Sequence, residues 1–459
     1  MKKAKRQFPR KRTAQAAAPG GAAGATEFLV EITKPLYGGQ FLARHESKAV
    51  FVPLSLPGEQ VRVRITDEKK SYSVAEPVET VLASIDRTAP ACPHFGVCGG
   101  CSYQHTTYVL QLAMKESILR ETLTRSGVTP TEKIDVLAAD PWAYRNRIRL
   151  GFDAQGNPGY RGRRSHAIVP IRECPIAARS LVSAAQTIAE VCRGASPSLR
   201  LSEVSLLCNH DGSALLATLF AVSPTRSIDN RQLKPIFNGL AERIPALGGV
   251  EILVEASEHE PVRSLAKWGD ASIQYRVGGF DYRVDQGAFF QVNRWLIDAL
   301  IDRVVAQHSG SVAWDLFAGV GLFARQLTKS FAKVVAVESA PNAIAALEAN
   351  LEGTSGSAVR ATSLDFLRRA AESGKQAGAL NNPDLVIVDP PRTGLGPEVT
   401  AFLGQVAPAT IVYVSCDPAT LGRDLRALIE GGYSIDSIAL ADLFPQTYHL
   451  ETIVKLHHS

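Results

Sequence analysis

Residues 312–321 read Val-Ala-Trp-Asp-Leu-Phe-Ala-Gly-Val-Gly, and this stretch decides the fold. An apolar strand runs into a turn that carries Gly319 and Gly321, and a helix and a second strand ending at Glu338 follow. Glycines at such a turn let the backbone approach a bound nucleotide, and an acid at the tip of the second strand can accept hydrogen bonds from ribose hydroxyls. The order of strand, glycine turn, helix, strand and acid therefore predicts an open α/β sheet with a nucleoside site.

The same turn favours S-adenosylmethionine over NAD. The dinucleotide fingerprint needs a third glycine, and here Phe323 and Ala324 stand where a pyrophosphate would need room. Later strands also end in acids, because Asp365 follows a short polar turn and Asp389 opens the run Asp-Pro-Pro-Arg. Ligands of open α/β sheets bind outside the carboxyl ends of the strands, so we expect these side chains in one crevice.

Another strand of this series delivers a thiol to a turn. Residues 411–420 read Ile-Val-Tyr-Val-Ser-Cys-Asp-Pro-Ala-Thr, in which a β-branched run leads to Cys416 and Pro418 ends the strand. Cysteine reacts as the thiolate, and backbone N–H groups at a strand-to-helix turn lower the pKa of a thiol. Taken alone, the motif fits a reactive cysteine or a buried structural one.

Three cysteines within ten residues form a metal-binding motif. Cys92, Cys98 and Cys101 stand in a Cys-x5-Cys-x2-Cys run whose glycines let the backbone wrap around an ion. A closed four-thiolate site needs a fourth ligand, and Cys174 is the best candidate. Two further cysteines lie in apolar stretches typical of core thiols, Cys192 and Cys208. Spacing alone fits zinc and an iron–sulfur cluster equally well.

The N-terminal part of the chain combines a basic tail with a β-rich segment. Residues 1–26 carry seven Lys or Arg in the first twelve positions and are otherwise rich in Ala and Gly, which predicts a disordered tail. Short β-rich runs separated by glycine and proline turns predict a small barrel over residues 27–85. Its Tyr-Gly-Gly turn and Leu-Pro-Gly-Glu run resemble the TRAM domain, an OB-like RNA-binding barrel.

Residues 86–270 are expected to form a central α+β domain that carries the cysteine motif, because strands and helices alternate from residue 134 to about 270. Between residues 145 and 172, seven arginines stand against a single acid, Asp153, with aromatic residues interleaved. Arginine forks suit phosphates and aromatic rings suit unstacked bases, so this run predicts RNA contact, with a solvated face as the alternative. The arginines are Arg145, Arg147, Arg149, Arg161, Arg163, Arg164 and Arg172.

Length and composition set the broad class. The 459 residues exceed one ordinary core, since domains usually hold about 100–200 residues. A net charge of +5 is small, so any nucleic-acid footprint must come from local clusters. Because the start lacks a secretory signal, no apolar run reaches about 18 residues, and the cysteines are odd in number, we expect a soluble, reduced, cytoplasmic monomer.

With these motifs assembled, residues 27–459 resemble the RNA (uracil-5-)-methyltransferase family, in particular its ribosomal-RNA branch with a TRAM domain and an iron–sulfur cluster. The resemblance rests on the cysteine motif, Tyr-Arg-Asn-Arg, Gln-x-Asn, Asp-Leu-Phe-x-Gly-x-Gly, Asp-Pro-Pro-Arg, Ser-Cys-Asp-Pro-x-Thr and Phe-Pro-x-Thr-x-His-x-Glu. It implies a Rossmann-like class I methyltransferase domain over residues 271–459. It also implies that the amphipathic helix at residues 107–126 packs with that domain.

The resemblance further implies the site residues. A [4Fe–4S] cluster is expected on Cys92, Cys98, Cys101 and Cys174. The S-adenosylmethionine pocket is expected on Gln291, Phe317, Glu338, Asp365 and Asp389. Leu322 stands where the family commonly has a polar residue.

The implied reaction explains the residue types. Uracil C5 is a poor nucleophile, but addition of a thiolate at C6 makes C5 an enolate carbon that can accept a methyl group. A base must then remove the C5 proton so that the thiolate can leave. The resemblance assigns Cys416 as the nucleophile and Glu451 as the base, and His449 is expected to pack or orient. The uridine must be flipped or unpaired, and we expect it in 23S ribosomal RNA, with transfer RNA as the alternative.

Three other readings of the sequence make different predictions. A radical S-adenosylmethionine enzyme can share the barrel and three cysteines, but its cysteines are spaced x3 and x2. An exocyclic-amine methyltransferase fits Asp-Pro-Pro but needs no thiol. An RNA-binding assembly factor on the same scaffold would bind the cofactor weakly.

Overall fold

The computed structural model describes residues 27–195, 199–222, 230–255, 262–377 and 383–458, and the predicted basic tail lies outside them. By their contacts the described residues form two units. The smaller unit ends at Ala83 but leaves out residues 35–40, which group with the larger unit. The larger unit otherwise begins at Ser84. None of the described helices combines the length and hydrophobicity needed to cross a bilayer.

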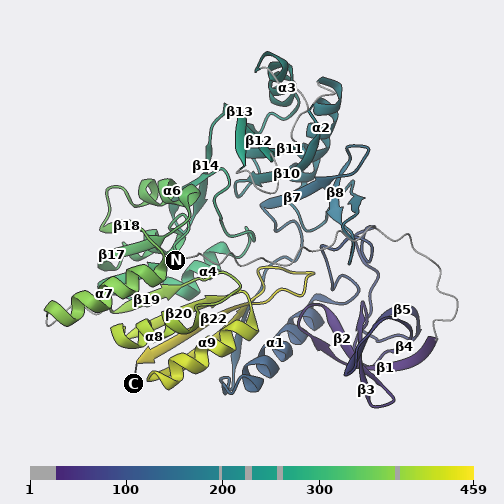
Figure 1. The fold of residues 1–459 in the computed structure, drawn as a ribbon, viewed down its shortest axis with the longest axis horizontal. Helices are drawn as coiled ribbons and strands as arrows, with labels where there is room; N and C mark the ends of the chain where they lie inside the picture. Colours follow the sequence, from purple (N-terminus) through teal and green to yellow (C-terminus); the bar gives the residue numbers. More distant parts are fainter. Residues whose placement is uncertain (1–26, 196–198, 223–229, 256–261, 378–382, 459) are drawn as a thin grey trace, which may run out of the picture. The chain divides into compact units, whose positions relative to one another are not determined.

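The smaller unit is a closed barrel of five strands (Figure 1). The strands are β1 (Glu27–Leu36), β2 (Gln40–His45), β3 (Lys48–Pro53), β4 (Gln60–Glu68) and β5 (Tyr72–Leu82), and they pair in the order β1-β2-β3-β5-β4. Alternate residues fill the interior, such as Val30 and Ile32 of β1 and Val61 and Val63 of β4. The barrel was predicted from the sequence, whereas β2 was not among the strand segments named there.

A seven-stranded sheet forms the first part of the larger unit, the predicted central α+β domain. Its order is β13-β12-β11-β10-β7-β8-β9. The strands are β7 (Arg147–Phe152), β8 (Pro158–Arg161), β9 (Ile168–Pro170), β10 (Leu201–Cys208), β11 (Leu215–Val222), β12 (Leu247–Glu255) and β13 (Arg263–Gly269). Helices α2 (Arg179–Ala195) and α3 (Asn230–Arg243) bury one face of this sheet in a single apolar core. Cys192 and Cys208 lie in that core, as expected of structural thiols.

An eight-stranded sheet of order β18-β17-β16-β19-β20-β22-β21-β6 forms the rest of the larger unit. The strands are β6 (Ile134–Leu137), β16 (Gly310–Leu316), β17 (Phe331–Glu338), β18 (Gly356–Arg360), β19 (Leu385–Val388), β20 (Thr410–Ser415), β21 (Tyr433–Ala441) and β22 (Glu451–His458). The strands from β18 to β20 run parallel, and β22 returns antiparallel to β20. This is the open α/β sheet that the sequence predicts.

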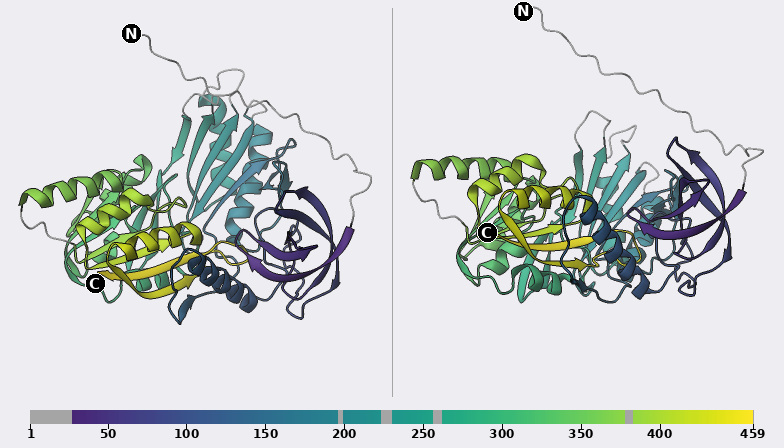
Figure 2. Two further views of the ribbon diagram at one scale, coloured as in Figure 1. Left: turned by 60° about the horizontal axis from the view of Figure 1, so that its bottom comes forward. Right: turned by 90° about the horizontal axis from the view of Figure 1, so that it is seen from below.

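Helices lie on both faces of this sheet (Figure 2), and each face is buried in an apolar core. One core includes α4 (Ile297–Val305), α5 (Leu322–Leu327), α6 (Pro341–Leu351) and the hairpin of β14 (Ser272–Val277) and β15 (Phe280–Asp285). The other includes α1 (Tyr108–Arg125), α7 (Ser363–Ala377), α8 (Gly396–Val406) and α9 (Pro418–Glu430). The strand ends at the carboxyl edge are therefore held by packing on two sides.

The segment from α1 to β6 precedes the central sheet in sequence but packs with the eight-stranded sheet. Helix α1 lies against α9, and β6 pairs with β21 at the edge of the sheet. Lys115 of α1 forms a fully buried ion pair with Asp442, with 2.6 Å between Nζ and Oδ1. Placing residues 134–137 in the central domain by sequence was therefore wrong.

Candidate active site

The predicted glycine turn connects β16 to α5 and leaves room beside its backbone. Gly319 and Gly321 adopt φ values of 56° and 87°, and Phe317 has φ 66°, a left-handed value that is strained for a side-chain-bearing residue. A Cβ placed on Gly319 would meet no heavy atom within 4 Å. The turn thus presents bare backbone to open space, which suits a nucleoside.

Glu338, at the end of β17, already holds this turn. One carboxylate oxygen accepts the Gly319 N–H at 2.8 Å, and the other accepts the N–H groups of Ser339 and Ala340 at 2.6 Å. The Glu338 side chain is therefore fixed at the strand tip where the sequence places it. Carboxylate oxygens keep further lone pairs, so Glu338 can still accept ribose hydroxyls.

Two acids lie at the ends of neighbouring strands, the fully buried Asp315 and the half-buried Asp389. Asp315 accepts the Ala324 N–H at 2.9 Å, and its other oxygen is buried without a partner among the described residues. Burial raises the pKa of Asp315 to about 8 and that of Asp389 to about 7. Gln291 Nε2 donates to Asp389 at 3.4 Å, so two of the predicted cofactor residues meet. An unpaired buried oxygen beside a glycine turn fits a bound ligand with hydrogen-bond donors.

Asp365 occupies a more exposed place than the other predicted cofactor residues. It lies in the first turn of α7, where the Thr362 hydroxyl donates to its carboxylate at 2.7 Å and its own N–H donates to Thr362 Oγ1 at 3.1 Å. This reciprocal pair caps the helix. The structure therefore shows a capping role for Asp365, and contact with adenine stays a prediction.

Cys416 and Glu451 come together through the register of one strand pair. Ser415 pairs with Thr452 in the antiparallel ladder of β20 and β22, so the next residues outward, Cys416 and Glu451, follow side by side at the carboxyl edge. Asp417 accepts the N–H groups of Ala419 and Thr420 at 3.0 Å and thereby starts α9 directly after the cysteine. Cys416 is half-buried and Glu451 is buried.

Charged neighbours shift the pKa values of Cys416 and Glu451 in opposite directions. Burial raises the pKa of Cys416 to about 12, and the carboxylates of Glu451 and Asp389 add to that shift, whereas Arg392 opposes it. Burial also raises the pKa of Glu451 far above its ordinary range, again with Asp389 adding and Arg392 opposing. Arg392 is therefore the cation that favours the charged forms of both groups.

A histidine holds Arg392 in place. The Arg392 guanidinium lies 3.2 Å from His449 Nδ1, and burial together with Arg392 lowers the pKa of His449 to about 4. A neutral imidazole can accept this hydrogen bond at Nδ1, so His449 orients the arginine. The Tyr37 hydroxyl donates to the Cys416 carbonyl at 3.3 Å and so braces the cysteine turn.

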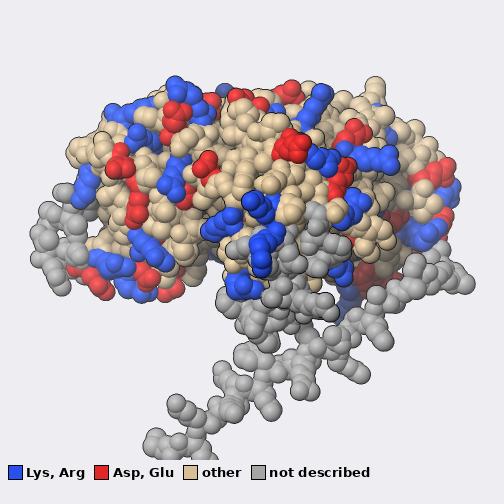
Figure 3. All heavy atoms as spheres, turned by 90° about the horizontal axis from the view of Figure 1, so that it is seen from above, with Lys and Arg blue, Asp and Glu red and all other residues tan. Residues whose placement is uncertain are grey.

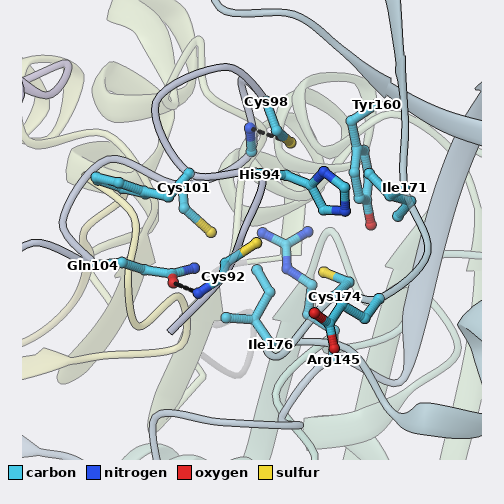
Figure 4. A pocket seen from close by; sticks show the side chains of 13 residues that line it. Cys92, His94, Cys98, Cys101, Gln104, Arg145, Tyr160, Ile171, Cys174 and Ile176 are labelled. Carbon is cyan, nitrogen blue, oxygen red and sulfur yellow. Dashed lines mark hydrogen bonds between the residues drawn. The ribbon is translucent and has the colours of Figure 1, made fainter. Parts of the chain in front are cut away.

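The four cysteines of the predicted cluster line one cavity (Figure 4). Cys92, Cys98 and Cys101 come from the loop before α1, and Cys174 comes from the segment before α2. Burial raises the pKa of all four thiols, that of Cys101 to about 12. Among the described residues, no three His, Cys, Asp or Glu side chains are grouped tightly enough to hold a metal ion.

Arg145 belongs to this cavity. Its guanidinium points between the thiols in Figure 4, and its Nε lies 3.3 Å from the Tyr144 hydroxyl. Arg145 lowers the pKa of Cys98, Cys101 and Cys174 against the larger effect of burial. The sequence interpretation that grouped Arg145 with RNA-facing arginines was wrong about its surroundings, because it precedes β7 and turns inward.

The comparisons with known proteins agree with this geometry. The sequence profile described as tRNA (Uracil-5-)-methyltransferase matches residues 107–459, and the TRAM domain profile matches residues 25–78. The chain belongs to the uracil-5-methyltransferase family. It is an RNA-methylating enzyme with a TRAM barrel, a central α+β domain and a Rossmann-like methyltransferase sheet.

Several relatives of this methyltransferase match along most of its length. It is 33% identical over 426 residues to the 23S rRNA (uracil(1939)-C(5))-methyltransferase of Shewanella amazonensis, covering 90% of this chain and 91% of the relative. It is 32% identical over 437 residues to the protein of the same name from Pectobacterium atrosepticum, covering 92% and 91%. A Thermotoga maritima protein named as an uncharacterized RNA methyltransferase is 31% identical over 445 residues. That match covers 93% of this chain and 98% of the relative.

A solved structure has the same fold. The Pyrococcus abyssi tRNA (uracil-54, C5)-methyltransferase, in complex with S-adenosyl-L-homocysteine, matches with a TM-score of 0.72 and 24% identity. The match covers 93% of this methyltransferase and 100% of that chain. At this identity the likeness supports the fold and leaves the substrate open.

Three residues of the site were not identified as such from sequence. Arg392 was seen only as the end of a motif, Tyr37 only as part of a barrel turn, and Arg145 only as one of a run of arginines. The motif Asp-Pro-Pro-Arg was a usable signal for Arg392, because a cation at the carboxyl edge of a strand suits a thiolate. No local sequence signal predicts that Tyr37 contacts Cys416.

Proposed function

We propose that this methyltransferase transfers a methyl group from S-adenosylmethionine to C5 of a specific uridine in RNA, with 23S ribosomal RNA as the substrate. The β20–β22 register supports this mechanism, because Cys416 and Glu451 directly follow the Ser415–Thr452 pair at the edge that also holds Asp389 and the glycine turn. Gln291, Phe317, Glu338, Asp365 and Asp389 form the cofactor pocket in this proposal.

Each residue has one task in the reaction. S-adenosylmethionine, when bound, supplies an electrophilic methyl group. Cys416 adds as thiolate to uracil C6, and the C5 carbon so activated takes the methyl group. Glu451 then removes the C5 proton, the C5–C6 double bond re-forms, and the sulfur leaves as thiolate. Arg392, oriented by His449, stabilises the thiolate and the carboxylate that these steps require.

The choice of RNA rests on the relatives. The proteins of Shewanella amazonensis, Pectobacterium atrosepticum and Klebsiella pneumoniae that match at 32–33% identity are all named for 23S rRNA. Mapping 5-methyluridine in RNA from a deletion strain tests this proposal. We expect one 5-methyluridine to be lost from 23S ribosomal RNA and restored by the wild-type gene. Its loss from transfer RNA instead would contradict the substrate, and no loss from either RNA would contradict the function.

Methylation is expected to rise with pH, because Cys416 and Glu451 both act in their deprotonated forms and the pKa values of both are raised. While thiolate attack limits the rate, the increase is about tenfold per pH unit below the pKa. Arg392→Met should move the profile to higher pH, since the arginine lowers both pKa values. Single-turnover rates from pH 6 to 9 measure this. The control is Arg426→Met, which removes an exposed cation on α9. An unchanged profile for Arg392→Met would contradict its role.

We also propose a [4Fe–4S] cluster on Cys92, Cys98, Cys101 and Cys174. Four half-buried thiols around one cavity repel one another once ionised, and a cationic metal core would compensate that charge. Four thiolates are the usual ligand set of a [4Fe–4S] cluster, and the resemblance to the family favours that cluster over zinc. Its distance in sequence from Cys416 suggests a role in folding or RNA positioning.

Protein purified without oxygen is expected to contain about four iron and four sulfide per chain and to absorb visible light. Cys101→Ser should lower both contents, because it removes one of the four proposed thiolate ligands around the cavity. Cys192→Ser is the matched control, because that thiol lies in the apolar core of the central sheet. One zinc per chain and no visible absorbance would overturn the cluster.

A further inference from the structure

A basic hollow lies where the cysteine loop, residues 92–101, meets the β8–β9 edge of the seven-stranded sheet. It has a volume of about 450 Å³ and is lined by four arginines and a single acid among the described residues. These are Arg149, Arg161, Arg163, Arg164 and Glu203. On the face drawn in Figure 3, basic and acidic side chains are interspersed over most of the surface. A hollow with four cations and one anion therefore departs from the general pattern.

One carboxylate serves two of these arginines. Arg149 Nε donates to Glu203 at 2.6 Å, and the Arg161 guanidinium lies 3.8 Å from the same side chain. Both arginine side chains remain more than half exposed, Arg149 at 58% and Arg161 at 64%. Arg149 also lies over the Phe220 ring at 4.6 Å. The hollow thus keeps a net positive charge that faces solvent.

Five glycines are among the residues that line the hollow, and two of them come from the loop that carries the cysteine motif, Gly99 and Gly100. The Gly99 N–H donates to the Arg161 carbonyl at 3.0 Å, and the Arg163 N–H donates to the Val97 carbonyl at 2.9 Å. A Cβ on Gly99 would stand 3.0 Å from the Arg161 oxygen. Backbone hydrogen bonds therefore join the loop that carries three of the cysteines to the turn that carries Arg161 and Arg163.

We infer that this hollow binds the sugar–phosphate backbone of the RNA that flanks the target uridine. The inference rests on the proposed function and adds a site to it. Guanidinium forks bind phosphate oxygens in two-point contacts, and bare backbone lets a phosphate approach closely. Phosphate contacts fix the position of an RNA without reading its sequence. The cysteine loop then supports the site that positions the substrate.

Two sets of variants in full-length, cluster-loaded protein test the site. Arg161→Gln/Arg164→Gln should weaken binding of an RNA fragment that the wild type methylates by about tenfold or more in low salt. The slope of log K against log salt should fall by about one to two units, because each lost phosphate contact removes 0.7–0.9. Glu203→Gln removes the acid and should tighten binding by about two- to tenfold. Iron content and S-adenosylmethionine affinity should stay at wild-type values.

The control is Arg243→Gln/Arg276→Gln, two arginines that are paired with carboxylates outside the hollow. It should leave both RNA affinity and salt slope unchanged. Wild-type affinity in the Arg161→Gln/Arg164→Gln protein, or unchanged or weaker binding in Glu203→Gln, would overturn the inference. If the wild type itself fails to methylate any RNA, the proposed function fails instead, so the two failures can be told apart.

Discussion

Cys416→Ala is expected to reduce methylation by at least about 10³-fold while S-adenosylmethionine still binds. The thiol is the group that makes C5 nucleophilic, so its loss removes the reaction path and not merely one favourable contact. Cys416 follows β20 and lies outside the glycine turn, so the cofactor pocket should remain intact. Single-turnover methylation with labelled cofactor, together with calorimetric cofactor binding, measures both effects.

Cys208→Ala is a suitable control for that variant. Its thiol lies fully buried in the central sheet core, and burial raises its pKa to about 11. We expect a modest loss of stability and near-normal methylation. Near-normal methylation by Cys416→Ala would instead favour an exocyclic-amine methyltransferase, which needs no thiol.

Glu451→Gln is expected to trap the enzyme on its RNA. Addition and methyl transfer can proceed without the carboxylate, but the C5 proton cannot be removed, so the sulfur stays bonded to C6 of the methylated uridine. The protein–RNA species should survive denaturing electrophoresis and should carry the transferred methyl label only when S-adenosylmethionine is present. Turnover should fall by about 10²- to 10⁴-fold, the usual range for loss of a general base.

Glu398→Gln, which changes an exposed acid in the first turn of α8, is the control for the trap. It should turn over normally and leave no bound RNA. Normal turnover by Glu451→Gln would exclude this residue as the base. A trapped species that lacks the methyl label would place its role before methyl transfer.

The sequence was sufficient to predict the α/β sheet and which residues lie at the ends of its strands. Gly319 and Gly321 adopt the positive φ values that their turn predicts, and Glu338 lies at the predicted strand tip. These features depend on local strand, turn and helix signals, which a sequence records directly. Glu338 and the two glycines therefore lie on the elements that the sequence predicts, and their contact with the cofactor stays a prediction.

Pairing across the chain could not be predicted in the same way. Cys416 and Glu451 meet because β22 runs antiparallel to β20 in one register, and a shift of one residue would turn Glu451 to the other face. Only the resemblance to a family linked the two residues beforehand. The placement of β6 beside β21 depends equally on tertiary packing, since residues 134–137 read as an ordinary short strand.

Charge patterns were the least informative. Arg145 and Arg149 look equivalent in sequence, yet Arg145 faces the cysteine cavity and Arg149 faces solvent. The difference arises because Arg149 alternates with buried residues within β7, whereas Arg145 precedes the strand. Asp365 shows the same limit, because an acid after a strand can contact a ligand or cap a helix.

The covalent mechanism is tested most directly with RNA that carries 5-fluorouridine at the target position. A base cannot remove fluorine as it removes a proton, so the wild-type enzyme should stop after methyl transfer. Mass spectrometry of the digested complex should find the methylated fluorouridine bonded to Cys416 in the wild type, and no adduct in Cys416→Ala. An adduct on a different cysteine, or full turnover without any adduct, would contradict nucleophilic addition by Cys416.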